Sequence, residues 1–254
     1  MTELLEQVLS AVLPNLQGII LLFCRVAAAV LLMPGFGSTL LPARVRLVVA
    51  IGFTLAVWPL VETGRHVDLL PGLFVEIAVG VVLGLSVRFL VFALQFAGSI
   101  ASQSTSIAQI GNAAAMPDPM PALGSILTLA GITLALALGL HVRIVEAIVL
   151  SYDAVPVGRF PPSDELARWA IRRSADAIAM GVTLAAPFIV TALAYNLALG
   201  AINRAMPQLM VAFVGAPAIT GAALLLMLVS APAILTLWTG AIGGVLADPF
   251  GAMP

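Results

Sequence analysis

The sequence predicts an all-α, polytopic membrane protein of about six apolar helical segments with an irregular loop in the middle. Of its 254 residues, 61% are hydrophobic and 9% are charged, whereas a soluble domain has about 45–50% apolar and about 25% charged residues. The mean hydropathy is +1.14. A soluble globule of this length would need far more charge to cover its surface. The apolar stretches are also separated by charges and turn residues, as membrane spans are.

The first two segments differ in length. The first covers residues 8–33, contains Arg25 and ends at Pro34. A turn that includes Pro42 leads to the second segment, 47–61. This second segment is short for a membrane span, because about 20 residues are needed to cross about 30 Å of hydrocarbon.

The third segment, 73–100, carries charges and glycines at helical spacing. Glu76, Gly80, Gly84 and Arg88 follow one another in four-residue steps, so they lie on one side of a helix. One interpretation is a partner-facing seam, in which the glycines let another helix approach and the charges pair with neighbours. The other is that Glu76 and Arg88 mark the ends of a shorter span near the headgroups. Both interpretations stay open.

The stretch 99–123 predicts the irregular middle loop. Pro117, Pro119 and Pro121 alternate with other residues, and a regular helix does not survive that spacing, because each proline lacks an N–H and restricts the residue before it. Irregular backbone at membrane depth is tolerated where protein or a water-filled cavity satisfies it. The alternative is an ordinary exposed loop. The small polar residues that favour a cavity are Ser99, Ser102, Gln103, Ser104, Thr105, Ser106, Gln109 and Asn112.

A more polar part of the chain follows the fourth apolar segment. That segment, 123–150, is interrupted late by His141, Arg143 and Glu146. Residues 151–176 are then the one clearly polar stretch, which predicts a region outside the bilayer.

A helix is expected to start inside this polar stretch, with Ser163 as its N-cap and acidic residues in its first turn. Asp164, Arg168, Arg172 and Asp176 follow at four-residue spacing. This spacing permits two i,i+4 ion pairs on one face. A solvated helix face is the expected role.

Two apolar segments complete the chain, 177–202 and 209–247. As one helix the last would be about 58 Å long at about 1.5 Å per residue, so a bend is expected. Pro217 and Pro232 are the candidates for it, and Pro187 has the same role in the fifth segment. The absence of an internal repeat or linker predicts a single domain, 1–254.

The sequence offers little for catalysis or metal binding. Cys24 is the one cysteine, and His66 and His141 are the only histidines, so we expect no metal site, no cofactor and interfacial structural roles for the histidines. No G-x-S-x-G, H-E-x-x-H or phosphate-loop motif occurs. The formal charge of −1 predicts no nucleic-acid partner. An enzyme is therefore not expected.

One stretch near residue 200 has a specific spacing, N-x3-G-x3-R-x2-P-Q, followed by Val-Gly-Ala-Pro. With this motif the chain resembles the FliR family, which comprises the flagellar biosynthetic protein FliR and its counterpart in virulence type III secretion. The motif residues are Asn196, Gly200, Arg204, Pro207, Gln208, Gly215 and Pro217. Weaker pieces that follow the family order are Arg25, Pro34, Pro42, Arg46, Gly98, Gln103, Asp118, Pro119, Gly139, His141 and the run Ser151 to Gly158. Departures from the family pattern are Ser99, Thr105 and Met210.

The resemblance implies a non-enzymatic subunit of the type III export gate, located in the bacterial inner membrane at the basal body of a flagellum or injectisome. Its helices would form bent hairpins that pack on FliP-like and FliQ-like subunits, with FlhB-like and FlhA-like proteins also present. Unfolded substrate proteins would pass through the channel, and the loop at 106–122 would plug it.

The resemblance also implies residue roles. The plug and gate residues would be Ser106, Gln109, Gly111, Asn112, Met116, Pro117, Asp118, Pro119 and Met120. Met116 and Met120 suit a deformable seal, because methionine is flexible and apolar. The motif residues from Asn196 to Pro217 would serve packing, and Arg25, Glu76 and Arg88 would serve subunit packing as intramembrane charges.

Two other functions remain as alternatives. The first is a secondary transporter for a small solute, with a midplane site formed where prolines break the helices. The second, which we rank last, is an intramembrane hydrolase.

Overall fold

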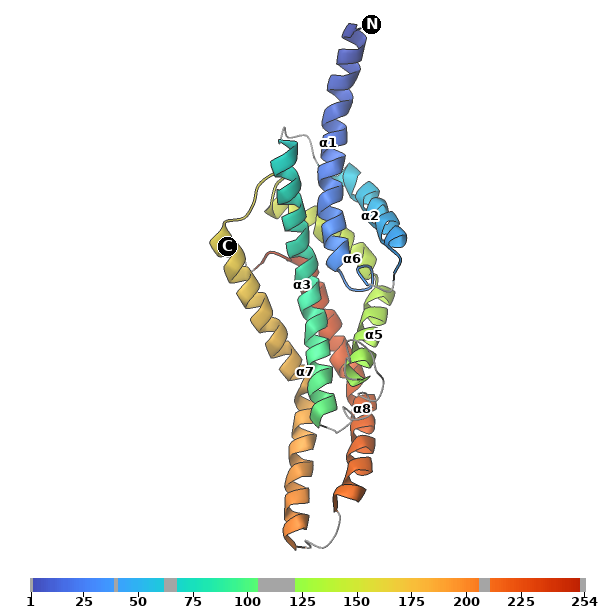
Figure 1. The fold of residues 1–254 in the computed structure, drawn as a ribbon, viewed down its shortest axis with the longest axis vertical. Coiled ribbons are helices and arrows are strands. Elements are labelled where there is room, and N and C mark those ends of the chain that lie inside the picture. The colour runs from blue at the N-terminus through green and yellow to red at the C-terminus, as the bar shows by residue number, and fades with distance from the viewer. Residues whose placement is uncertain (1, 39–40, 62–67, 105–121, 206–210, 252–254) are drawn as a thin grey trace. The chain divides into compact units, whose positions relative to one another are not determined.

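The structure, a computed structural model, describes residues 2–38, 41–61, 68–104, 122–205 and 211–251. Every regular element in those ranges is a helix, which confirms the predicted all-α class. The helices are α1 (Thr2–Leu32), α2 (Ala43–Val57), the 3-10 turn η1 (Trp58–Leu60), α3 (Leu69–Ser104), α5 (Ala122–Ala137), α6 (Leu140–Ala154), α7 (Ser163–Ala205) and α8 (Val211–Ala247) (Figure 1).

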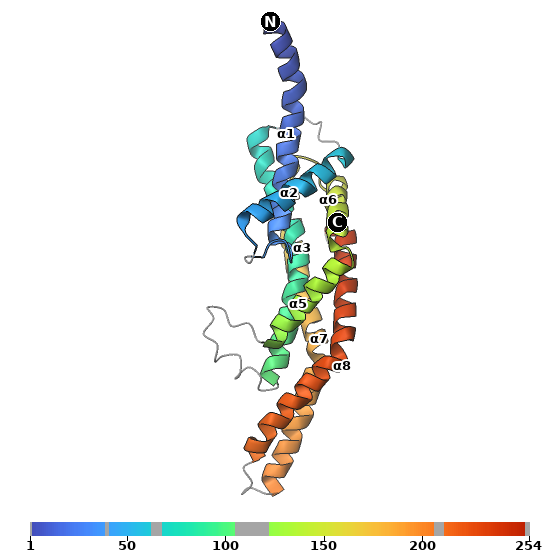
Figure 2. The same ribbon diagram turned by 90° about the vertical axis from the view of Figure 1, so that its right-hand side faces the viewer.

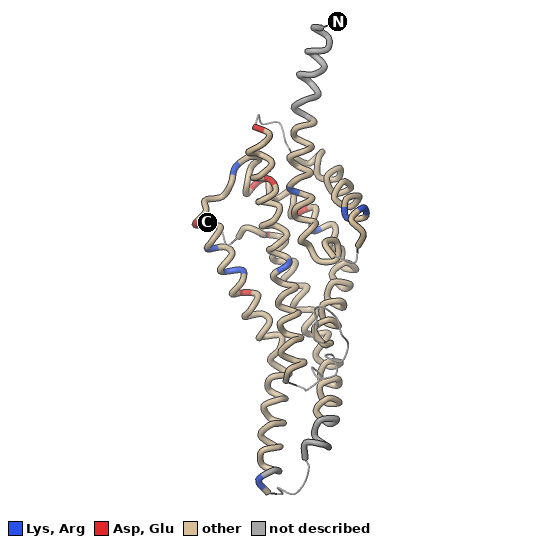
Figure 3. Tube along the Cα trace, in the orientation of Figure 1, with Lys and Arg blue, Asp and Glu red and all other residues tan. Residues whose placement is uncertain are grey.

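Several of these helices are long and apolar enough to cross a membrane, which confirms the polytopic class. Four spans meet that test: Ala43–Leu60, Leu69–Gln103, Ser163–Ile202 and Ile219–Ala247. A fifth arises if α5 and α6 form one broken span. Figure 3 shows why α7 and α8 qualify, because charges on α7 are confined to its two ends and α8 carries none.

The fourth predicted segment contains a sharp break. Helices α5 and α6 meet at an angle of 76°, and Gly139 between them has a φ of +84°. Glycine takes this left-handed conformation without the steric penalty that a Cβ would bring. Figure 2 labels α5 and α6 as two separate helices.

Helix α7 begins close to the predicted position. Its first turn starts at Ser163, and the carbonyl of Pro162 accepts the first backbone hydrogen bond, from Leu166 (3.1 Å). The helix start is thus one residue earlier than an N-cap at Ser163 would place it. The predicted pair of Asp164 with Arg168 is present, and both side chains are about two-thirds exposed (65% and 64%), as expected of a solvated face.

The last two segments are helical throughout their described length. Helix α7 continues through Pro187, and α8 continues through Pro232. Bends at these prolines stay a prediction.

Contacts divide the chain into two compact units. The first contains residues 1–89, 136–173 and 242–254, and the second contains 90–135 and 174–241. Because α3, α7 and α8 each supply residues to both, neither unit is a continuous piece of chain.

In the first unit, α1 and α3 approach closely at two glycines. A Cβ on Gly80 would collide with the carbonyl of Arg25 and lie 2.8 Å from the Cβ of Ala28. A Cβ on Gly84 would lie 2.6 Å from the Cβ of Leu32. Of the two interpretations left open for this stripe, the close helix contact is therefore present, and the helix that approaches is α1 of the same chain.

The second unit is also built around close contacts. The indole N–H of Trp238, which is fully buried, donates to the carbonyl of Leu90 (2.7 Å). Gly131 leaves room for that indole ring. Gly98 of α3 packs directly on the backbone of Gly124 of α5, so these two helices touch at the ends that flank the middle segment of the sequence.

Candidate functional site

The most prominent polar site in the described part of the chain is a buried ion pair between α1 and α3. The Nε of Arg25 donates to Oε2 of Glu76 at 2.6 Å, and Nη2 donates to Oε1 at 3.1 Å. Both side chains are 0% exposed. Because an unpaired charge in an apolar interior is costly, this two-point pairing makes the burial of both charges tolerable.

The end of α6 completes the coordination of Arg25. Nη1 donates to the carbonyl and hydroxyl oxygens of Ser151 at 3.2 and 3.1 Å. Nη2 donates to the carbonyl of Val155 at 3.0 Å. These carbonyls belong to the last turn and cap of α6, where helices leave acceptors unsatisfied and favour a cation. The guanidinium thus makes five hydrogen bonds, which matches its five donors.

Residues in the last turn of α6 and in the turn after it also bind Glu76. The backbone N–H of Gly158 donates to Oε1 at 3.1 Å, and the hydroxyl of Tyr152 lies 3.4 Å from Oε2. The ring of Tyr152 packs against Arg25, with its centroid 3.7 Å from the guanidinium carbon, a cation–π arrangement. Gly158 has a φ of +74°, so the turn that delivers its N–H favours glycine.

We call Arg25, Glu76, Ser151, Tyr152, Val155 and Gly158 the α1–α3–α6 cluster. Its polar groups are turned toward one another, and the side chains of both charged residues are fully buried. Its role is therefore structural, because it joins three helices that are far apart in the sequence. Within the described ranges, no three metal-ligating side chains come together either.

A second polar contact ties the chain end to α7 in the first unit. The indole N–H of Trp169 donates to the carbonyl of Pro249 (3.2 Å). Arg173 donates to the carbonyls of Asp248 and Pro249 at 3.1 and 3.4 Å. Phe250 is buried beside them, so the residues after α8 are packed against the protein.

The predicted packing residues occupy different settings. Arg88 lies half-buried on α3. Asn196, Gly200 and Arg204 follow at four-residue steps on α7, and all three are exposed. Gly215 and Pro217 fall in the first turns of α8, where side chains lie outside the described part, and Pro207 and Gln208 lie outside the described residues.

The predicted plug residues cannot be placed in this fold. All nine, Ser106, Gln109, Gly111, Asn112, Met116, Pro117, Asp118, Pro119 and Met120, lie outside the described residues. Of the predicted plug segment 106–122, the described part begins with Ala122, the first residue of α5.

Sequence reasoning did not assign roles to Ser151, Tyr152, Val155 or Gly158. In the sequence they stood out only as members of the run Ser151 to Gly158, which follows the family order. In addition, 126 residues separate Arg25 from Ser151. The available signal was Arg25 itself, since a charge within an apolar segment requires a partner. Which partner it finds depends on the tertiary fold.

The fold and the cluster together define an all-α, multi-pass membrane protein whose helices are joined by an internal, fully paired charge site. The chain belongs to the bacterial export proteins, family 1, which it matches over residues 16–245. This match confirms the family resemblance read from the sequence.

Individual relatives agree with that membership. The chain is 37% identical over 227 residues to the flagellar biosynthetic protein FliR of Caulobacter vibrioides, covering 86% of this chain and 90% of the relative. It is 28% identical to the protein of the same name from Aquifex aeolicus, over 85% and 86% of the two chains. The corresponding Escherichia coli protein is 29% identical, over 76% of each chain.

Proposed function

We propose that this chain is a non-enzymatic subunit of a flagellar-type protein export gate, a channel in the bacterial inner membrane through which unfolded proteins pass. The observation that carries the proposal is the family match across residues 16–245, together with relatives named flagellar biosynthetic protein FliR that align along most of their length. The basal body is the expected location.

The exposed surface supports a role in an assembly. Helix α2, the later part of α7 and the middle of α8 present large apolar side chains away from this chain's own core, as Val48, Val190, Leu197, Leu228 and Val229 illustrate. Exposed apolar surface of this extent is covered in use, either by lipid or by other protein chains. FliP-like and FliQ-like subunits, with FlhB-like and FlhA-like proteins, are the partners we propose.

The exposed motif on α7 supports the same idea. Asn196, Gly200 and Arg204 lie on one stripe of the helix, and no described atom would contact a Cβ on Gly200. Arg204 forms no hydrogen bond or ion pair with the described residues. A specific motif that contacts little of its own chain is suited to contact another chain.

The charged residues then have two roles in the proposal. Arg25 and Glu76 are buried inside the first unit and act indirectly. Their ion pair keeps the helices of this unit in the arrangement that sister subunits pack against. Arg88 is less buried and contributes at the packing seam. The segment 106–122 closes the channel, with Met116 and Met120 as its seal.

Replacement of the chain in its own cell tests the proposal. Deleting its gene should abolish export of flagellar-type substrates, and an affinity-tagged copy should restore export and retain FliP-like and FliQ-like proteins after extraction in a mild detergent. A purified chain that transports a small solute by itself in liposomes, while the deletion strain still exports, would favour the transporter alternative and contradict the gate.

A further inference from the structure

A hollow of about 560 Å³ lies between α6 and the end of α8, within the first unit. Its walls are mostly apolar. Leu138, Val142 and Leu150 line it from the α6 side, and Leu246 lines it from α8. The first three of these side chains are each roughly half exposed.

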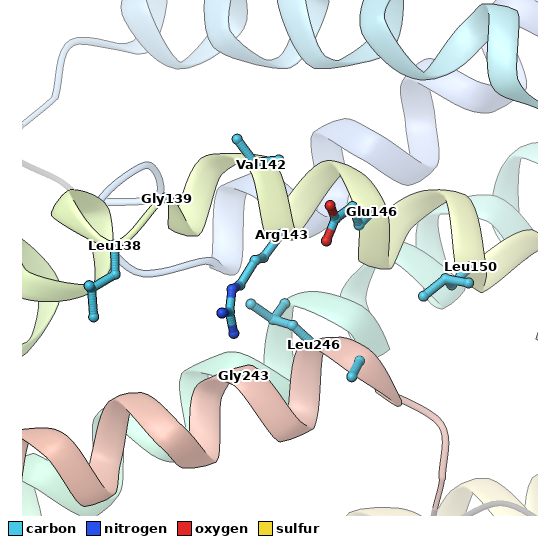
Figure 4. A pocket seen from close by; sticks show the side chains of 9 residues that line it. Leu138, Gly139, Val142, Arg143, Glu146, Leu150, Gly243 and Leu246 are labelled. Carbon is cyan, nitrogen blue, oxygen red and sulfur yellow. The ribbon is translucent and has the colours of Figure 1, made fainter.

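Two opposite charges lie on the wall of this hollow and pair with nothing described. Arg143 and Glu146 are both exposed and are three residues apart on α6, a spacing that puts them on one side of the helix. Figure 4 shows the Arg143 side chain extending toward α8, whereas the Glu146 side chain stays close to α6. In the described ranges, neither forms a hydrogen bond or an ion pair.

The position of Arg143 depends on a glycine of α8. A Cβ on Gly243 would lie 2.5 Å from Nη1 of Arg143, so a larger residue there would displace the guanidinium. Because Gly243 lacks a side chain, Arg143 reaches across the hollow to α8 (Figure 4).

The hollow also lies at the end of a membrane-spanning helix. Gly243 and Leu246 belong to the last turns of the apolar span Ile219–Ala247, after which the chain continues with Asp248. The ends of such spans lie near the level of the phospholipid headgroups. A charged hollow at that level is open to lipid.

We propose that this hollow binds the headgroup of an aminophospholipid, with Arg143 holding the phosphate and Glu146 holding the ammonium group. Arginine matches phosphate oxygens with paired donors, and a carboxylate accepts hydrogen bonds from an ammonium. The apolar wall contacts the first carbons of the acyl chains. The volume lies within the range of about 300–1,000 Å³ found for small-ligand pockets.

The pair of charges distinguishes this headgroup from others. An anionic lipid such as phosphatidylglycerol offers its phosphate to Arg143 but no cation to Glu146, whose charge opposes further negative charge. A choline headgroup has no N–H to donate to Glu146. A whole helix, about 10 Å across with its side chains, would rest over the hollow instead of filling it and would leave both charges to find partners on its surface.

Lipid titration with native mass spectrometry tests the proposal on the full chain in a mild detergent. Phosphatidylethanolamine, phosphatidylcholine and phosphatidylglycerol with identical acyl chains are the probes. We expect phosphatidylethanolamine to bind best. Arg143→Gln should weaken its binding about tenfold, the effect of losing one charge-assisted hydrogen bond, and Arg143→Lys should retain part of the binding. Glu146→Gln should abolish the preference for phosphatidylethanolamine over phosphatidylglycerol.

Arg168→Gln is the matched control, because Arg168 is also an exposed arginine but lies outside the hollow, and it should leave lipid binding unchanged. Equal binding of the three lipids by the unmodified chain would overturn the proposal without relying on any variant. Unchanged phosphatidylethanolamine binding by Arg143→Gln and Glu146→Gln would also overturn it. The proposal would likewise be overturned if these variants kept their lipid binding but no longer co-purified with a sister subunit. Export activity is not the readout, so the result is independent of the gate proposal.

Discussion

Arg25 is an instructive residue, because its burial is tolerable only while each of its five donors has an acceptor. Three of those acceptors come from residues 151–155 and two from Glu76. Glu76 in turn accepts from Gly158 as well as from Arg25. Removing one charge therefore leaves the other buried without its counter-ion, a situation that costs more than the intact pair contributes.

Replacing Glu76 by Gln should destabilise the chain by about 3–5 kcal/mol, because the guanidinium of Arg25 would stay buried without a negative charge. The thermal unfolding midpoint of the detergent-solubilised chain measures this effect. The control is Asp164→Asn, which breaks the exposed Asp164–Arg168 pair and should cost less than about 1 kcal/mol. Equal shifts in the two variants would mean that the buried cluster does not hold the fold together.

Arg204 represents the opposite case, an exposed residue expected to act on a neighbouring chain. Arg204→Ala should leave the unfolding midpoint of the isolated chain nearly unchanged, since surface changes are usually within about 0.5 kcal/mol. We expect it to reduce the amount of FliP-like and FliQ-like protein that co-purifies. Arg172→Ala, which removes an exposed arginine near the other end of α7, is the comparison. Wild-type assembly and export by Arg204→Ala would exclude the packing role.

At the scale of elements, glycines decide where helices touch. Gly80 and Gly84 bring α3 against α1, and this contact holds the backbone of Arg25 at the distance from which its side chain reaches Glu76. Gly52 on α2 is different, because a Cβ there would meet no described atom within 4 Å. The two kinds of glycine should therefore respond oppositely to the same substitution.

Gly80→Ala should destabilise the chain by about 1–3 kcal/mol, because the added methyl overlaps the carbonyl of Arg25 and forces the helices apart. Gly52→Ala should be neutral or stabilise by up to about 1 kcal/mol, because alanine favours a helix and has room here. Unfolding midpoints of both variants in the same detergent provide the comparison. A stabilising Gly80→Ala would contradict the close contact between α1 and α3.

At the scale of the whole molecule, the exposed apolar surface of the helices must be covered by the surroundings of the chain. Lipid can cover such helices, and so can sister subunits, and the family membership favours an export assembly. The segment 106–122 is the part that we propose closes this assembly, so its removal is a test at this scale.

Deleting residues 110–120 should raise the small-ion conductance of the assembled gate, because the channel would lose its plug while the flanking helices α3 and α5 keep their Gly98–Gly124 contact. Planar-bilayer or vesicle ion-leak recordings of the purified complex would measure the change. Subunit composition must match that of the wild type for the comparison to be valid. Unchanged conductance in a fully assembled gate would contradict the plug assignment.

Much of the fold followed from local chemistry. The run of apolar residues interrupted by charges and prolines predicted helices where α1, α2, α3, α7 and α8 lie. Ser163 and the acids after it predicted the start of α7 to within one residue. The stripe of Gly80 and Gly84 indicated a close helix neighbour as one of two interpretations. These signals are short-range, because periodicity, capping and glycine packing act over a few turns of helix.

The sequence by itself determined the membrane class, the helical segments and the need of Arg25 for a partner. Only the tertiary structure decided that this partner is Glu76, that the turn from Ser151 to Gly158 encloses both charges, and that Arg143 and Glu146 share a hollow with the end of α8. The physical reason is that a charged residue in an apolar segment requires a counter-charge or hydrogen-bond partners, but its position in the sequence does not identify them. That choice depends on which helices the chain brings together across more than a hundred residues.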